Sequence, residues 1–121
     1  MLALKGAIKA EIEEGERIKL LLFVSSHCPH CPGAERVARK VAPAYYEHGL
    51  SYSKIRTKTS EGKDLSSRYN IMGTPAMLLL DDDWKELKRI VGVPSEDSLK
   101  NDIENALGMR KSLFSRLLGG K

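Results

Sequence analysis

Two cysteines, Cys28 and Cys31, are separated by two residues in the segment Ser-His-Cys-Pro-His-Cys-Pro, and the chain has no others. A structural disulfide framework would use more cysteines, spread along the chain to close long loops. A bridge between residues three positions apart closes a very short loop and therefore stabilises a fold little. The pair is better placed for thiol–disulfide exchange than for holding a fold together.

The segment lies between a predicted strand and a predicted helix. Free N–H groups and the dipole at a helix N-terminus favour a negative charge, so we expect the pKa of the Cys28 thiol to lie below its ordinary value. Cys31, about one turn along, would then attack the mixed disulfide that Cys28 forms. Pro29 suits the first turn of the helix. His30 would stabilise the Cys28 thiolate through a hydrogen bond or, when protonated, through its charge.

Zinc binding is the main alternative for this segment, because His27, Cys28, His30 and Cys31 are all potential ligands. A structural zinc site normally takes a second pair of ligands from elsewhere, and the only other histidine is His48. The zinc alternative therefore requires a site whose ligands come from two copies of the chain in a dimer. We expect no metal and no cofactor. The alternative function is a non-catalytic module that binds peptides or a metal.

The pattern of apolar residues predicts the elements that position the cysteines. A continuous apolar run at residues 17–24 predicts a strand buried on both faces. Helical spacing predicts a helix from Cys31 to about His48, in which Pro43 should kink or end the regular part. The same criteria predict the remaining helices and strands at 2–14 (helix), 50–57 (strand), 61–69 (helix), 76–80 (strand), 84–91 (strand) and 95–108 (helix, with Ser95 as N-cap).

This order predicts an α/β fold, a three-layer α/β/α sandwich with a mixed sheet of about four strands and an N-terminal helix. The first two strands would be parallel through a crossover helix, and the last two would form a hairpin. Helices should cover both faces, because the central strands are apolar throughout. The three aspartates at residues 81–83 predict a solvated turn rather than a calcium site. We expect Trp84 to be a half-buried packing residue, Tyr45 a core residue and Tyr46 partly exposed.

The net charge of +4 comes from the C-terminal end of the chain. Residues 1–108 hold all 16 acidic residues and an equal number of basic ones, which argues against a nucleic-acid-binding surface spread over the fold. We expect one domain at 1–108 and a basic amphipathic tail at 109–121. Such a tail contacts a membrane surface or a partner, or packs on its own domain or a second copy. We expect a monomer.

The N-terminal residues are charged where a signal peptide would need an apolar block, so we expect no signal peptide. The sequence has no run of about 18 apolar residues, so we expect no membrane span. We therefore expect the protein to be cytoplasmic.

The strand, the Cys-Pro-His-Cys segment and the following helix, together with Gly-Thr-Pro-Ala at residues 73–76 before a hairpin, resemble the thioredoxin superfamily over about residues 17–107. The resemblance implies a protein-disulfide oxidoreductase in which Cys28 attacks and Cys31 resolves. It implies protein dithiol or disulfide substrates and a reductase that the sequence does not identify. It also implies that the Thr74–Pro75 bond is cis, lies against the dithiol and offers the Thr74 backbone to a substrate peptide.

Two positions depart from the usual thioredoxin pattern. His27 stands where thioredoxins usually carry Trp, and Leu22 stands where they place a buried acid. The His30 side chain should stabilise the reduced form, so we expect a reduction potential above the about −270 mV of thioredoxin. The potential should lie at or below the about −120 mV of the strongest periplasmic oxidants.

Overall fold

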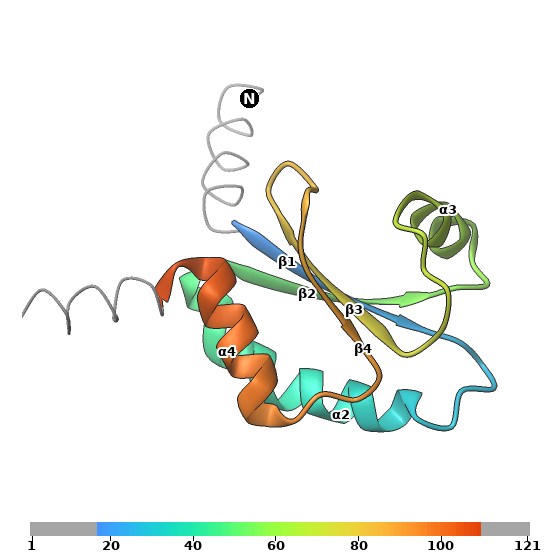
Figure 1. The fold of residues 1–121 in the computed structure, drawn as a ribbon, viewed down its shortest axis with the longest axis horizontal. Coiled ribbons are helices and arrows are strands. Elements are labelled where there is room, and N and C mark those ends of the chain that lie inside the picture. Colours follow the sequence, from blue (N-terminus) through green and yellow to red (C-terminus); the bar gives the residue numbers. More distant parts are fainter. Residues whose placement is uncertain (1–16, 110–121) are drawn as a thin grey trace, which may run out of the picture.

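A computed structural model of the chain describes residues 17–109 (Figure 1). Within them the elements follow the order β1 (Ile18–Val24), α2 (Cys31–Val41), the 3₁₀ helix η1 (Ala42–His48), β2 (Leu50–Arg56), α3 (Ser60–Arg68), β3 (Ala76–Asp81), β4 (Glu86–Val91) and α4 (Glu96–Leu107). The helix expected at 2–14 lies outside the described residues, and so does the expected tail beyond Met109.

The four described strands form one mixed sheet in the order β2-β1-β3-β4. β1 runs parallel to β2 and antiparallel to β3, and β3 and β4 form a hairpin. β1 and β3 are the central strands, which explains why both are almost continuously apolar: a strand with neighbours on both sides and helices above and below has no polar face.

Helices cover both faces of the sheet and complete three layers (Figure 1). Residues Leu20 and Leu22 of β1 point to the face covered by α2, η1 and α4. Residues Leu21 and Phe23 point to the opposite face, where α3 contributes Leu65. The predicted α/β/α sandwich with a mixed four-stranded sheet is therefore confirmed. None of the helices in the described residues combines the length and apolar character needed to cross a membrane.

The helix that follows the cysteines changes from an α-helix to a 3₁₀ helix near Pro43, as the sequence predicts. α2 ends at Val41, two residues before Pro43, and the chain continues as η1. Proline has no N–H and its ring collides with the preceding turn of an α-helix, so the regular helix ends there. Gly49 ends η1 with φ 103°, a left-handed conformation that glycine adopts at little cost.

The hairpin corrects the predicted strand at 84–91, because β4 begins only at Glu86. One carboxylate oxygen of Asp81 accepts hydrogen bonds from the backbone N–H groups of Asp83 and Lys85, both at 2.9 Å, which closes a turn around the aspartates. Trp84 belongs to this turn with φ 65° and is 43% exposed. The Lys19 ammonium lies over the Trp84 ring, 5.0 Å from the ring centroid, in a cation–π contact. Trp84 therefore packs against a side chain of β1 and is not part of a strand.

Tyr45 links η1 to α4 by donating its phenol hydrogen bond to Glu104. Burial and then this hydrogen bond raise the pKa of Tyr45 to about 12. An unfolded chain loses the same proton near pH 10. The folded state binds the proton more tightly, so this contribution to stability falls as pH rises from about 10 to about 12.

Tyr45→Phe should therefore lower the free energy of unfolding by about 1 kcal/mol at pH 7. The difference between wild type and variant should shrink above pH 10, as followed by urea unfolding. An unchanged difference at pH 7 and at pH 11 would show that the proton on Tyr45 is not linked to folding.

Candidate functional site

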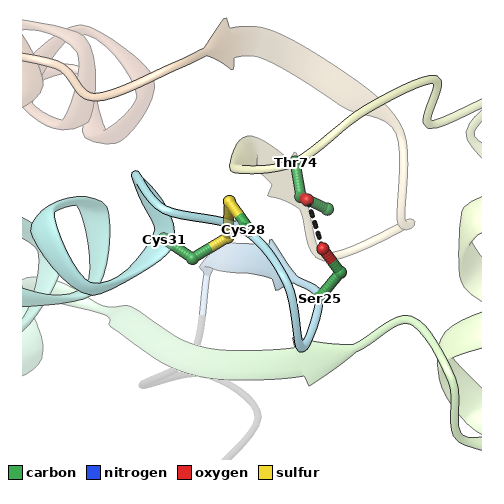
Figure 2. Close-up of a disulfide and its surroundings, with 4 residues drawn as sticks. All are labelled: Ser25, Cys28, Cys31 and Thr74. Carbon is green, nitrogen blue, oxygen red and sulfur yellow. Dashed lines mark hydrogen bonds between the residues drawn. A yellow bond between two sulfur atoms is a disulfide. The ribbon is translucent and has the colours of Figure 1, made fainter.

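The end of β1 and the start of α2 hold the two cysteines (Figure 2). β1 ends at Val24, a loop carries Cys28, and Cys31 is the first residue of α2. The two cysteines form a disulfide with their Cα atoms 5.4 Å apart. The Cys31 N–H donates to the Cys28 carbonyl oxygen at 3.3 Å, so the backbone already turns tightly between them.

The two sulfur-bearing residues differ in their access to solvent. Cys31, the first residue of α2, is 5% exposed. Cys28 is partly exposed, in the loop above. An incoming sulfur can therefore reach Cys28 far more easily than Cys31. This asymmetry suits an attacking first cysteine and a resolving second cysteine.

The helix begins at Cys31, as predicted from the sequence. Pro29 was expected in the first helical turn, and this expectation was wrong, because Pro29 lies in the turn that precedes α2. His30 is the N-cap residue, and its exposed ring makes no hydrogen bond within residues 17–109. His27 is also exposed. Pro32 lies in the first turn of α2, where a missing N–H costs no hydrogen bond.

Strand register brings Thr74 and Pro75 to the cysteine loop. Phe23 of β1 is paired with Ala76 of β3 in antiparallel register. Continuing each chain by two residues in opposite directions places Ser25 opposite Thr74, at the point where the loop leaves the sheet. The Thr74–Pro75 bond is cis, as the resemblance implies. The buried Pro75 is held by its carbonyl oxygen, which accepts from the Gly92 N–H at 2.9 Å.

Ser25 joins the two loops directly and was not predicted from the sequence. Its hydroxyl and the Thr74 hydroxyl are 2.7 Å apart and share a hydrogen bond (Figure 2). The contact fixes Thr74 relative to the loop that carries Cys28. A serine one residue past a strand gives no pattern of its own, so only the pairing of β1 with β3 reveals its partner.

Ser25→Ala should lower the free energy of unfolding by about 1 kcal/mol, since it removes a partly buried hydrogen bond. We also expect it to raise the KM for a protein disulfide severalfold, because the resemblance implies that the Thr74 backbone contacts the substrate peptide and the substitution removes the hydrogen bond that orients Thr74. Ser25→Thr keeps a hydroxyl and should largely restore the KM. Steady-state kinetics with insulin would measure the effect, and a wild-type KM for Ser25→Ala would argue against a positioning role.

A cavity of about 340 Å³ opens beside the disulfide, on the side of β2. Both cysteines line it together with Pro32 and Glu35 of the α2 region. The opposite wall comes from the end of β2 and the following loop, with the charged residues Lys54, Arg56 and Lys58. This wall was not predicted from the sequence, although Lys54 and Arg56 are two residues apart on β2 and therefore share one side of the strand.

Similarity to known proteins agrees with this geometry. A family model described as a thioredoxin-like domain matches residues 4–107. The chain belongs to the thioredoxin-like family. A probable thioredoxin of Archaeoglobus fulgidus is 36% identical over 91 residues, which cover 75% of this chain and 91% of that protein. A thioredoxin of Methanocaldococcus jannaschii is 30% identical over 94 residues, which cover 75% and 98%.

Solved structures support the same fold. A mutant thioredoxin of Halobacterium salinarum superposes with a TM-score of 0.60 at 24% identity, over 80% of each chain. A malaria parasite thioredoxin-2 superposes with a TM-score of 0.64 at 19% identity, over 74% of this chain and 82% of that one. Family membership and the paired Cys28 and Cys31 together make this protein a thiol–disulfide oxidoreductase.

Leu22 sets this thioredoxin-like domain apart from the usual pattern. Its side chain is fully buried in the core between the sheet and α2, with Ala34 and Ala38 in the same cluster. The position to which the resemblance assigns a buried acid is therefore apolar. Among the described residues that line the cavity with the cysteines, the one carboxylate is that of Glu35, which pairs with Lys54 at 3.0 Å.

The phenol of Tyr52, which interacts electrostatically with Glu35, stays neutral. Burial, and next the negative charge of Glu35, raise the pKa of Tyr52 to about 12. The phenol therefore keeps its proton throughout the pH range in which thiols exchange with disulfides.

In the oxidised form, the disulfide occupies both sulfurs, so neither cysteine offers a thiolate to a metal. Among residues 17–109, the one group of three potential metal ligands is Asp81 to Asp83 in the hairpin turn. The Asp81 carboxylate forms the turn described above, and the side chains of Asp82 and Asp83 are exposed.

Proposed function

We propose that this oxidoreductase exchanges the Cys28–Cys31 dithiol and disulfide with cysteines of protein substrates. Cys28 is the nucleophile, and Cys31 resolves the mixed disulfide. The Thr74 backbone next to Pro75 holds the substrate peptide. The observation that supports the proposal is a partly exposed Cys28 paired with a buried Cys31, in a loop whose Ser25 hydroxyl shares a hydrogen bond with Thr74.

Two residues between the cysteines tune the thiolate in this proposal. Pro29 stiffens the turn before α2. The exposed His30 at the helix N-cap is free to turn toward the Cys28 sulfur once the disulfide opens. A protonated imidazole beside a thiolate stabilises the reduced form and makes the couple more oxidising.

We further propose that the protein works as a monomer in the cytoplasm and receives electrons from a reductase. A compartment that keeps thiols reduced can regenerate the dithiol after each turnover. Thioredoxins act on protein disulfides and are themselves reduced by a reductase, and the same cycle is proposed for this chain.

Insulin reduction by dithiothreitol tests the proposal against that of a non-catalytic binding module. The wild-type protein should accelerate insulin precipitation, and Cys28→Ser should act no faster than dithiothreitol alone. Equal activity of the two proteins would exclude Cys28 as the nucleophile. Ser67→Ala, which changes an exposed residue of α3, is the control and should keep the wild-type activity.

A further inference from the structure

The positive side chains that line the cavity beside the disulfide are only partly neutralised by carboxylates. Lys54 is neutralised locally, because its ammonium lies 3.0 Å from the Glu35 carboxylate. Arg56 and Lys58 line the same cavity, and neither pairs with a carboxylate of residues 17–109. The wall that faces the two sulfurs therefore bears two uncompensated positive charges.

The backbone holds this wall close to the cysteine loop. Arg56 is the register partner of Val24, the last residue of β1 before the loop begins. The next N–H, that of Thr57, donates to the Val24 carbonyl oxygen at 3.0 Å and extends the pairing beyond the strand. The charged side chains of the β2 end thus stand beside the segment that leads to Cys28.

We propose that this cavity is a subsite for a carboxylate or phosphate carried close to the sulfur of the disulfide substrate. The cavity of about 340 Å³ is in the range of small-molecule sites, about 300–1,000 Å³, so it can take half of a small anionic disulfide. The inference rests on the proposed function and names a preferred class of substrate for the same site.

The proposed exchange balances in bonds, electrons and protons. The Cys28 thiolate attacks one sulfur of the small disulfide, the substrate S–S bond breaks, and one anionic half leaves as a thiolate. The Cys31 thiolate then attacks the Cys28 sulfur, and the second half leaves. Two electrons pass from the protein dithiol to the substrate, and the protons of the two protein thiols go to the released thiols. During the mixed-disulfide stage, the anionic group of the bound half lies against Arg56 and Lys58.

Three disulfides of matched size test the charge preference: dithiodipropionate is anionic, bis(2-hydroxyethyl) disulfide is neutral, and cystamine is cationic. Prereduced full-length protein is mixed with each, and the loss of protein thiols is followed with time. Each rate is divided by the rate that dithiothreitol gives with the same disulfide, which removes the intrinsic reactivity. We expect the normalised rate of the anionic disulfide to exceed that of the neutral one about tenfold, and cystamine to be slowest.

Arg56→Gln combined with Lys58→Gln should lower the anionic-to-neutral ratio to near one. The matched control is Lys85→Gln with Lys88→Gln, which removes the same charge from exposed residues on the hairpin, outside this cavity. The control should keep the wild-type ratio. High salt should also reduce the wild-type ratio, because exposed charges are screened. Equal losses of the ratio in both double variants would overturn the proposal.

A pair of cystine peptides separates the two sources of the anion. One peptide carries Asp beside its cysteine and the other carries Asn. A preference for Asp without a preference among the small disulfides would support the subsite and assign it to acidic segments of protein substrates. No preference in either series would overturn it. Failure to react with all the disulfides, the neutral one included, would instead count against the proposed function.

Discussion

A Cys31→Ser variant is expected to accumulate as a stable mixed disulfide with its substrate through Cys28. The partly exposed Cys28 can still attack, but the buried sulfur that would release the substrate is gone. Incubation of the reduced variant with an oxidised protein substrate should give a covalent adduct with the summed mass of the two chains, which disappears on addition of dithiothreitol. Turnover in the insulin assay should fall to the rate of dithiothreitol alone.

Cys28→Ser removes the proposed nucleophile and keeps the proposed resolving cysteine. Its remaining thiol, Cys31, is 5% exposed, so the same incubation should give little or no adduct. Mass spectrometry of the two variants side by side therefore distinguishes the roles of the two cysteines. A stable adduct on Cys28→Ser, with none on Cys31→Ser, would reverse the assignment of nucleophile and resolving residue.

Gly62→Ala is expected to lower the free energy of unfolding by about 2 kcal/mol. A Cβ at this position would lie 1.8 Å from the carbonyl oxygen of Arg56 and 2.9 Å from the Cα of Thr57, both of them backbone atoms. Forcing an extra carbon into a packed contact costs about 3 kcal/mol, and the higher helix propensity of alanine returns about 1 kcal/mol. Urea unfolding of the variant would measure the net loss.

Gly33→Ala is the matched control, because it makes the same chemical change in α2. Its added Cβ would meet only the methyl groups of Val93, at 3.8 and 3.9 Å, which is ordinary contact. This variant should be as stable as the wild type or more stable by up to about 1 kcal/mol. Similar losses for the two variants would mean that α3 does not pack on the end of β2 as closely as described.

The sequence alone predicts most of this fold because each main element has a strong local cause. The apolar runs of β1 and β3 follow from burial on both faces, and Pro43 ends the regular part of α2 through its missing N–H. The Trp84 region was predicted less well. Its residues suit a strand, but hydrogen bonds from backbone N–H groups to the Asp81 carboxylate set the turn, and apolar spacing does not report them.

The site was predictable to a similar degree. Cys28, Cys31 and the Thr74–Pro75 pair follow from local motifs and a family resemblance. Ser25 and the charged wall of the cavity depend on strand register, because Ser25 meets Thr74 and Arg56 meets Val24 only once the strands are paired. Pro29 lies outside α2 because the chain forms a turn between the cysteines, and the helical spacing of apolar residues does not report this turn.

Redox titration of the Cys28–Cys31 couple shows whether this disulfide exchanges and whether His30 stabilises its reduced form. The protein is equilibrated in thiol–disulfide buffers of known potential, and its free thiols are then counted by mass after alkylation. We predict a single two-electron transition with a midpoint above about −270 mV and at or below about −120 mV. A midpoint at or below about −270 mV would contradict the thiolate-stabilising role given to His30, and one below about −300 mV would indicate a structural disulfide rather than an exchanging one.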